Sequence, residues 1–115
     1  MRIKRIVVNA KAVAVVEDEM PLITDAMVAM EIMMRAKFEL GAGLLAIEAS
    51  SLAPEFFDPD AGMAEEMLKI FAEYGVKCAV FGELGFYDSE KLAALGEKVF
   101  LTEDADRAIE WLTTT

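Results

Sequence analysis

Residues 44–82 read LLAIEASSLAPEFFDPDAGMAEEMLKIFAEYGVKCAVFG, and this stretch decides the fold class. It opens with the short apolar run 44–48 and closes with a second apolar run over 77–82. Between the runs, apolar residues recur at the spacing of one helix face, and Gly75 stands where such a helix stops. These helical positions are Met63, Met67, Ile70, Phe71 and Tyr74. Apolar runs that flank a helix are typical of buried parallel strands, so the stretch predicts a strand–helix–strand unit.

The helix of this unit is expected over residues 59–74. Its start is marked by Asp58-Pro59, because Asp caps helix starts and Pro is preset for the first turn. Further upstream, residues 3–8 and 12–16 are rich in β-branched residues and are separated by Asn9-Ala10-Lys11. Asn tolerates the positive φ of tight turns, so this segment predicts a β-hairpin.

A first helix is predicted over residues 25–39, with Thr24 as its N-cap and Gly41 and Gly43 beyond its end. Its helical period is carried by Ile23, Met27, Met30, Met34 and Phe38. We expect Met27, Met30 and Met34 to form one core stripe, and Met33 to widen it so that the helix is apolar on two faces.

The C-terminal part predicts a third helix that is capped by Asp88 and ends at Gly96, and then a strand over 98–101. A fourth helix follows, capped by Thr102 or Asp104. Its inward positions are expected to be Ala105, Ala108, Ile109 and Leu112. Together the elements predict an α/β fold, with a sheet of about five mixed strands covered by about four helices.

The length and composition fit one domain that folds around a core. The chain has 115 residues, of which 56% are hydrophobic, and disordered chains are poor in such residues. We therefore expect a single domain over residues 1–115.

The net charge of −10 narrows the choice of partners. It results from 11 Lys and Arg against 21 Asp and Glu. Nucleic acids and anionic membranes are negatively charged themselves, so neither is expected as a partner. The acidic surface serves solubility alone, or it also meets a basic protein partner.

Histidine is absent and Cys78 is the one cysteine, which leaves few routes to catalysis or metal binding. No His-based triad, His metal site or internal disulfide can form. Cys78 lies in an apolar run, where we expect an inert buried thiol. The N-terminus has no signal-peptide core and no apolar stretch is long enough to span a membrane, so we expect a cytoplasmic protein.

Motifs for cofactors are weak. The glycine pairs of 41–43 and 82–85 match no phosphate-binding fingerprint and are expected to be turn residues. Glu55, Asp58 and Asp60 could hold Mg²⁺ or Ca²⁺, but acidic residues are favoured at a helix start by its dipole alone. We expect no metal and no cofactor.

Aromatic pairs stand at two loops. Phe56-Phe57 precedes the predicted helix 59–74, where one ring acts as a hydrophobic staple or both pack in the core. Phe86-Tyr87 follows the strand 77–82, and ligands of open α/β sheets usually lie beyond the carboxyl ends of strands. Packing over the sheet edge is the alternative for this second pair.

The chain resembles the DUF4180 family of small bacterial domains of unknown function. The resemblance rests on Glu55-Phe-Phe-Asp58 with the helix and strand that follow, and on Ala108-Ile-Glu-Trp-Leu112 after an apolar strand. The other positions that carry it are Gly62, Ala64-Glu65, Leu68-Lys69, Phe71, Tyr74 and Lys77-Cys-Ala-Val-Phe-Gly82. Between Tyr87 and Val99 the chain is shorter than the family pattern and lacks an Asn-rich element.

More distantly, the order of elements is similar to SpoIIAA-like and STAS domains. This resemblance implies a STAS-like fold and a regulatory role, in which a partner kinase phosphorylates a serine at the start of the second helix. Here the matching stretch is Phe57-Asp58-Pro59-Asp60 and has no serine, so Asp60 places a permanent charge there. The fold also resembles the lipid-binding part of Sec14-type proteins, which implies an apolar ligand.

Two functional hypotheses follow, and an enzyme is the least favoured because no nucleophile–base pair is evident. The first is a protein-interaction or regulatory module with an unidentified partner. Its expected surface comprises Ser51, Phe56, Phe57, Asp58 and Asp60. The second is a binder of a small apolar ligand or lipid, or a homodimer. The expected apolar surface comprises Met30, Met33, Met34, Phe86 and Tyr87.

Overall fold

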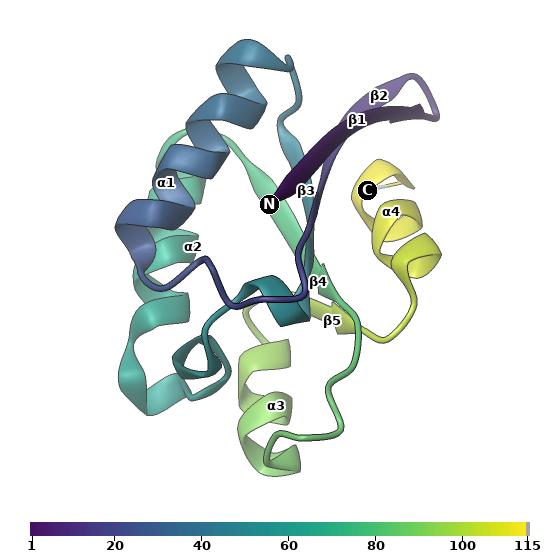
Figure 1. Ribbon diagram of the computed structural model, residues 1–115. Helices are drawn as coiled ribbons and strands as arrows, with labels where there is room; N and C mark the ends of the chain where they lie inside the picture. The colour runs from purple at the N-terminus through teal and green to yellow at the C-terminus, as the bar shows by residue number, and fades with distance from the viewer. Residues whose placement is uncertain (115) are drawn as a thin grey trace.

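The computed structural model describes residues 1–114, which form a five-stranded sheet with helices on both faces (Figure 1). The strands are β1 (Arg2–Val8), β2 (Lys11–Glu17), β3 (Leu44–Glu48), β4 (Lys77–Phe81) and β5 (Phe100–Thr102). They lie in the order β1-β2-β3-β4-β5, with β1 antiparallel to β2 and the remaining pairs parallel. The predicted α/β class and mixed sheet are confirmed.

The α-helices divide unequally between the two faces of the sheet. They are α1 (Ala26–Met34), α2 (Met63–Glu73), α3 (Ser89–Gly96) and α4 (Ala105–Thr114). The helices α1, α2 and α3 cover one face, and α4 covers the other (Figure 1). Each parallel strand is added beside the preceding one, and crossovers are right-handed, so the three connecting helices fall on the same side.

Strand β2 shows why the apolar runs of the sequence are continuous. Ala14 and Val16 pack in the core beneath α1 and α2, whereas Val13 and Val15 pack beneath α4. Successive side chains of a strand point to opposite faces, and here both faces are covered. The strand is therefore apolar at consecutive positions rather than at alternate ones.

The β1–β2 hairpin turns at two residues with positive φ. Asn9 has a φ of 53° and Ala10 a φ of 63°, and Val8 pairs with Lys11 across the turn. Two central residues with positive φ match the right-handed twist of paired strands. The predicted hairpin is confirmed.

Helix α1 begins one residue later than predicted and ends in a different helical form. Asp25, not Thr24, is the N-cap, and its side chain accepts the backbone N–H of Val28. After Met34 the chain continues as a π-helix over Arg35–Glu39. The π form is rare and occurs mostly as single wide turns, often at functional sites.

The predicted core stripe of α1 is wrong for Met27, which is 61% exposed. Met30 and Met34 are partly buried and pack against the core, and Met33 is fully buried. The fully buried face consists of Ala26, Ala29, Ile32, Met33 and Ala36. Small alanine side chains allow the helix backbone to approach the sheet closely. The helix has two apolar faces as predicted, but its most buried methionine is Met33.

The start of α2 is also later than predicted. Asp58 caps a single 3-10 turn over Pro59–Ala61 instead of the α-helix. Gly62 then adopts a left-handed φ of 78°, which interrupts helical geometry, and α2 starts at Met63. Two further 3-10 turns, Ala49–Ser51 and Pro54–Phe57, fill the segment after β3.

The remaining boundaries follow their local signals closely. Gly75 ends α2 with a φ of 66°, and Asp88 caps α3 by accepting the N–H groups of Glu90 and Lys91. The last strand lies at Phe100–Thr102, two residues beyond the predicted start. Asp104 accepts the N–H of Asp106 at the beginning of α4.

Candidate functional site

The loops that follow β2, β3, β4 and β5 gather at the carboxyl end of the sheet, in the lower half of Figure 1. Ligands of open α/β sheets bind at this end. The loop segments 18–25, 49–62, 82–88 and 103–104 contain no Lys or Arg. Their acidic residues are Asp18, Glu19, Asp25, Glu55, Asp58, Asp60, Glu83, Asp88, Glu103 and Asp104. We call this set of loops the acidic edge.

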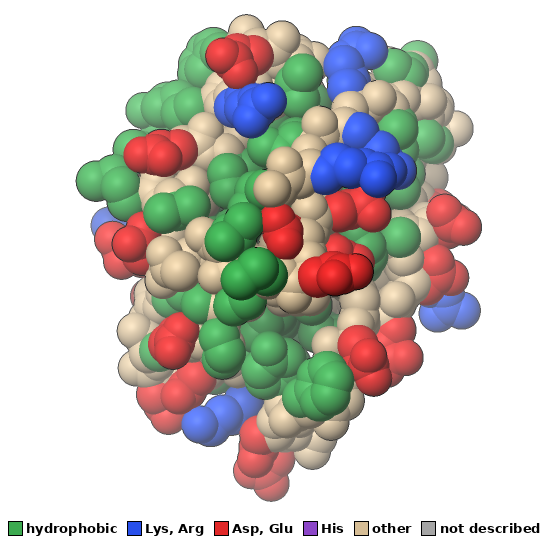
Figure 2. Space-filling model, in the orientation of Figure 1, with side chains coloured by type: hydrophobic (Ala, Val, Ile, Leu, Met, Phe, Trp, Pro, Cys, Tyr) green, Lys and Arg blue, Asp and Glu red, His purple; other side chains and the backbone are tan. Residues whose placement is uncertain are grey.

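The charge is distributed unevenly over the molecule. In Figure 2 acidic side chains lie over the whole face, including its lower half, whereas the main group of Lys and Arg side chains lies over β1 at the upper right. Single Lys or Arg side chains also lie in the lower half. Within β1, Lys4 pairs with Glu17 at 3.4 Å, and the N-terminal amine of Met1 lies 3.0 Å from Asp18. Negative charge that is concentrated at a set of loops produces a local negative potential, which attracts cations.

A hollow of about 250 Å³ opens within the acidic edge, between the loops after β3 and β4. It is lined by Glu48, Ala49, Ser50, Gly82, Glu83, Phe86 and Tyr87. Gly82 has a φ of +125°, and a Cβ at this position would lie 3.4 Å from the backbone nitrogen of Ala49. The positive φ favours glycine at this position, whereas a Cβ would make only an ordinary van der Waals contact with the loop after β3.

Aromatic rings build one wall of the hollow. The rings of Phe57 and Tyr87 stack with centroids 4.2 Å apart, and Phe86 packs edge-on against Tyr87 at 6.5 Å. Partial burial and then the negative charge of Glu55 raise the pKa of Tyr87, so its hydroxyl stays protonated at neutral pH. Phe86 is 78% exposed. Tyr87 is therefore anchored, and Phe86 offers its ring to solvent.

Three of the residues expected on the partner-binding surface are inside the protein. Ser51, Phe56 and Phe57 are at most 2% exposed. The Ser51 hydroxyl donates to the carbonyl of Glu48 at 2.6 Å, and the Phe56 and Phe57 rings pack against each other at 5.1 Å. Direct contact with a partner is therefore left to Asp58 and Asp60. The buried rings instead support the wall of the hollow from behind.

Asp58 and Asp60 lie beside the start of α3, a proximity that sequence reasoning missed. The Asp58 carboxylate lies 3.3 Å from Lys91 Nζ and accepts the N–H of Asp60 at 3.1 Å. Asp60 is exposed and borders a second hollow of about 250 Å³. Its lining comprises Pro59, Asp60, Asp88, Glu90, Lys91 and Ala94. Only tertiary contacts reveal this arrangement, because Asp58 and Lys91 are far apart in the chain.

The residues of the expected apolar surface fall into separate places. Met33 is buried in the core, and Met30 and Met34 line a groove on α1. Phe86 and Tyr87 belong to the hollow of the acidic edge and do not border that groove. One continuous apolar surface made of all five residues does not exist.

Among the described residues, the thiol and the carboxylates do not form a cluster that could hold a metal ion. Burial raises the pKa of the Cys78 thiol to about 12, so the thiolate is scarce at neutral pH. Within residues 1–114, no three His, Cys, Asp or Glu side chains are close enough to hold a metal ion. The carboxylates of the acidic edge are dispersed, and the edge can attract cations without enclosing one.

A family model for the domain of unknown function DUF4180 matches residues 8–112, which include β2 to β5, α1 to α3 and most of α4. The chain belongs to this family. No curated protein and no solved structure matches the chain. The likeness to SpoIIAA-like and STAS domains therefore stays a prediction. No helix among residues 1–114 has the length and apolar character needed to cross a membrane.

Proposed function

We propose that this DUF4180 domain is a non-catalytic interaction module whose acidic edge binds a basic segment of another protein. The observation that carries the proposal is the clustering of acidic loops, without any Lys or Arg, around a hollow with an exposed aromatic ring. Opposite charge steers a partner to its site and fixes its orientation.

The hollow suits a long cationic side chain. Glu48 and Glu83 supply negative charge at its rim, and Phe86 supplies an exposed ring face. A guanidinium or ammonium group gains from both, by ion pairing with a carboxylate and by cation–π contact with the ring. Asp60 adds a further negative charge beside the start of α3.

The charge at the acidic edge is permanent. SpoIIAA-like regulators are switched by phosphate on a serine, and the stretch that resembles theirs has Asp60 in an exposed position. A carboxylate is ionised at all physiological pH values. We infer that binding is constitutive and is controlled by the presence of the partner rather than by phosphorylation.

Asp60→Lys tests the proposal. We expect its affinity for an Arg-rich peptide to fall about tenfold or more, since a like charge then faces the ligand. The readout is isothermal titration calorimetry, with NMR chemical shifts to locate the bound peptide. Glu110→Lys, on the exposed side of α4, changes the net charge equally and is the matched control.

Equal losses in Asp60→Lys and Glu110→Lys would show that the peptide senses net charge only, and would reject the acidic edge as the site. Shifts confined to other surfaces would reject it as well. Affinity capture from cells with the same pair of variants then identifies the natural partner, which must be lost with Asp60→Lys and retained with Glu110→Lys.

A binder of a small apolar ligand is the second candidate function. It is favoured by the α1 groove of about 460 Å³, in which Met30, Met34 and Phe38 supply apolar surface. A bound ligand stabilises the folded state and raises Tm. Native mass spectrometry of the purified protein tests for a bound ligand, and thermal unfolding with a series of fatty acids tests for stabilisation. The absence of an adduct together with an unchanged Tm would exclude this function.

A further inference from the structure

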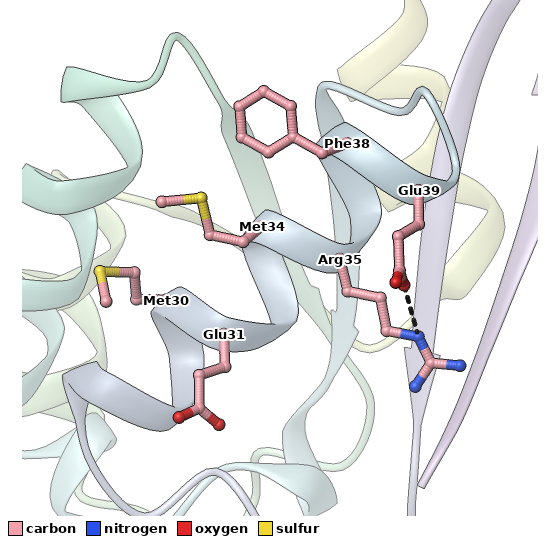
Figure 3. Close-up of a pocket in the computed structure, with 6 residues that line it drawn as sticks. All are labelled: Met30, Glu31, Met34, Arg35, Phe38 and Glu39. Atoms are coloured by element: carbon pink, nitrogen blue, oxygen red, sulfur yellow. Dashed lines mark ion pairs between the residues drawn. The ribbon is translucent and has the colours of Figure 1, made fainter.

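The outward face of α1 and its π-helical extension carries an apolar stripe. Met27, Met30, Met34 and Phe38 follow one another at spacings of three or four residues, which keeps them on one face of the helix. Met27 and Phe38 are among the most exposed large apolar side chains of the described residues. Figure 3 shows Met30, Met34 and Phe38 projecting from the same side of the helix. We call these four residues the outer stripe.

The outer stripe contributes only part of the packing that holds α1 on the core. The opposite face of the helix supplies the fully buried side chains, Ala26, Ala29, Ile32, Met33 and Ala36. Met30 and Met34 are partly buried and pack against the core at one side of the stripe, whereas Met27 and Phe38 are exposed. The remaining surface of Met30, Met34 and Phe38 lines an open groove. A row of large apolar side chains on a soluble surface usually marks an interaction site.

The charges beside the stripe are balanced and ordered. Glu31, Arg35 and Glu39 form a row along its other side, with Arg35 Nε 3.4 Å from Glu39 Oε2 (Figure 3). Together with Lys37, α1 and the π-helix carry two acidic and two basic residues, whereas the whole chain has a net charge of −10. Two copies of the protein can therefore meet at this face with little electrostatic repulsion.

We propose that the outer stripe is a homodimer interface, in which α1 packs antiparallel against α1 of a second copy about a two-fold axis near Met34. This arrangement places Met30 beside Phe38 of the second copy and Met34 beside its own counterpart. It also brings Glu31 within reach of Arg35 of the second copy. Each contact occurs twice, as a two-fold interface requires.

The ordered charge row favours a second copy over other occupants. A lipid or other apolar ligand makes no use of the alternating Glu31, Arg35 and Glu39, and this row, with a net charge of −1, attracts a basic partner only weakly. One pair of crossing helices buries less surface than a standard interface, so the dimer is expected to dissociate at about micromolar concentrations.

Sedimentation velocity of the full chain between about 1 and 100 µM tests the proposal, since this range spans the expected dissociation constant. The wild type is expected to shift from monomer to dimer. Phe38→Glu and Met34→Lys are expected to weaken the dimer about tenfold or more, because each buries a charge in the interface. Phe86→Glu, which alters the exposed ring of the acidic edge, is the matched control and circular dichroism checks the fold.

A second experiment tests the antiparallel arrangement. Glu31→Arg and Arg35→Glu are each expected to weaken the dimer, and the double variant is expected to restore it, because the opposite charges then face each other again. Three outcomes would each overturn the proposal. The wild type is monomeric at all concentrations, the dimer persists in Phe38→Glu, or the double variant does not restore the dimer that the single variants weaken. These outcomes are independent of peptide binding at the acidic edge.

Discussion

Asp18 links the loop after β2 to the N-terminus and to the loop after β3 through hydrogen bonds and an ion pair. Its carboxylate accepts the N–H of Met20 at 2.9 Å and pairs with the N-terminal amine. Its backbone carbonyl accepts the Ser50 hydroxyl at 2.5 Å, and its N–H donates to Glu48 at 3.1 Å. The hydrogen bond from Met20 and then the nearby amine lower the pKa of Asp18 below its usual 3.8.

Asp18→Asn tests this link through its pH dependence. The folded state prefers the ionised carboxylate, so the stabilisation is present above the ordinary pKa and disappears as pH falls below it. We expect the variant to be less stable than the wild type at pH 7, and this difference to be smaller near about pH 2.5, well below the ordinary pKa. Urea denaturation at the two pH values measures this, with Glu110→Gln as control. A difference that is the same at both pH values would contradict it.

Single residues were predictable where the signal is local. The caps and stops at Asp88, Gly75 and Asn9 depend on backbone geometry within a few residues, and the structure has them as expected. The positions of Ser51 and Phe57 depend on distant partners. Ser51 is buried and donates its hydroxyl to the carbonyl of Glu48, and the Phe57 ring is covered by Tyr87. The segment from Ser51 to Phe57, which sequence reasoning assigned to the surface, therefore lies largely in the interior.

At the scale of elements, the spacing of apolar residues predicts the position of α1 correctly but does not identify which of its faces is buried. Every third or fourth residue is apolar on both sides of this helix, so periodicity locates the helix but cannot decide which side meets the sheet. The fully buried face carries three alanines, Ala26, Ala29 and Ala36, which permit close packing, but it also carries Met33. The row of alanines favours this side, and neither size nor hydropathy alone decides where each methionine lies.

A matched pair of methionine variants measures the two faces of α1. Met33→Ala removes a fully buried side chain and is expected to lower the free energy of unfolding by about 2–5 kcal/mol. Met27→Ala removes an exposed side chain and is expected to change it by less than about 0.5 kcal/mol. Urea denaturation below about 1 µM keeps any dimer dissociated. Equal losses, or a larger loss at Met27, would reverse the assignment of the faces.

At the scale of the whole molecule, the direction of the strands decides the distribution of charge. The loops before β2, β3 and β4, at 9–10, 40–43 and 74–76, carry no acidic residue, and the loop 97–99 before β5 has Glu97 beside Lys98. Every loop after these strands carries acidic residues and no Lys or Arg. The alternating order of strands and helices was predictable, and so was the mixed sheet. The acidic edge could have been found by separating the loops that precede strands from the loops that follow them. The neighbouring positions of Asp58 and Lys91 could not, because they depend on how distant segments pack.

Salt is expected to stabilise the protein. Acidic loops crowded at one end repel each other, and this repulsion is screened as the Debye length falls from about 30 Å at 0.01 M to about 8 Å at 0.15 M salt. Exposed pairs such as Lys4–Glu17 are screened too, but such pairs contribute little. Tm is therefore expected to rise by roughly 4 °C, the shift that about 1 kcal/mol produces in a small domain. Scanning calorimetry in NaCl measures it, and a falling Tm would refute dominant repulsion.

The placement of α4 has a consequence for the life of the chain in the cell. One face of the sheet, with Val13, Val15, Ala46 and Ala79, is covered by this helix, which occupies the final described residues. During synthesis that face stays open after all five strands have emerged from the ribosome. A nascent or truncated chain that lacks residues 105–114 thus displays a broad apolar surface, the feature that chaperones and proteases recognise.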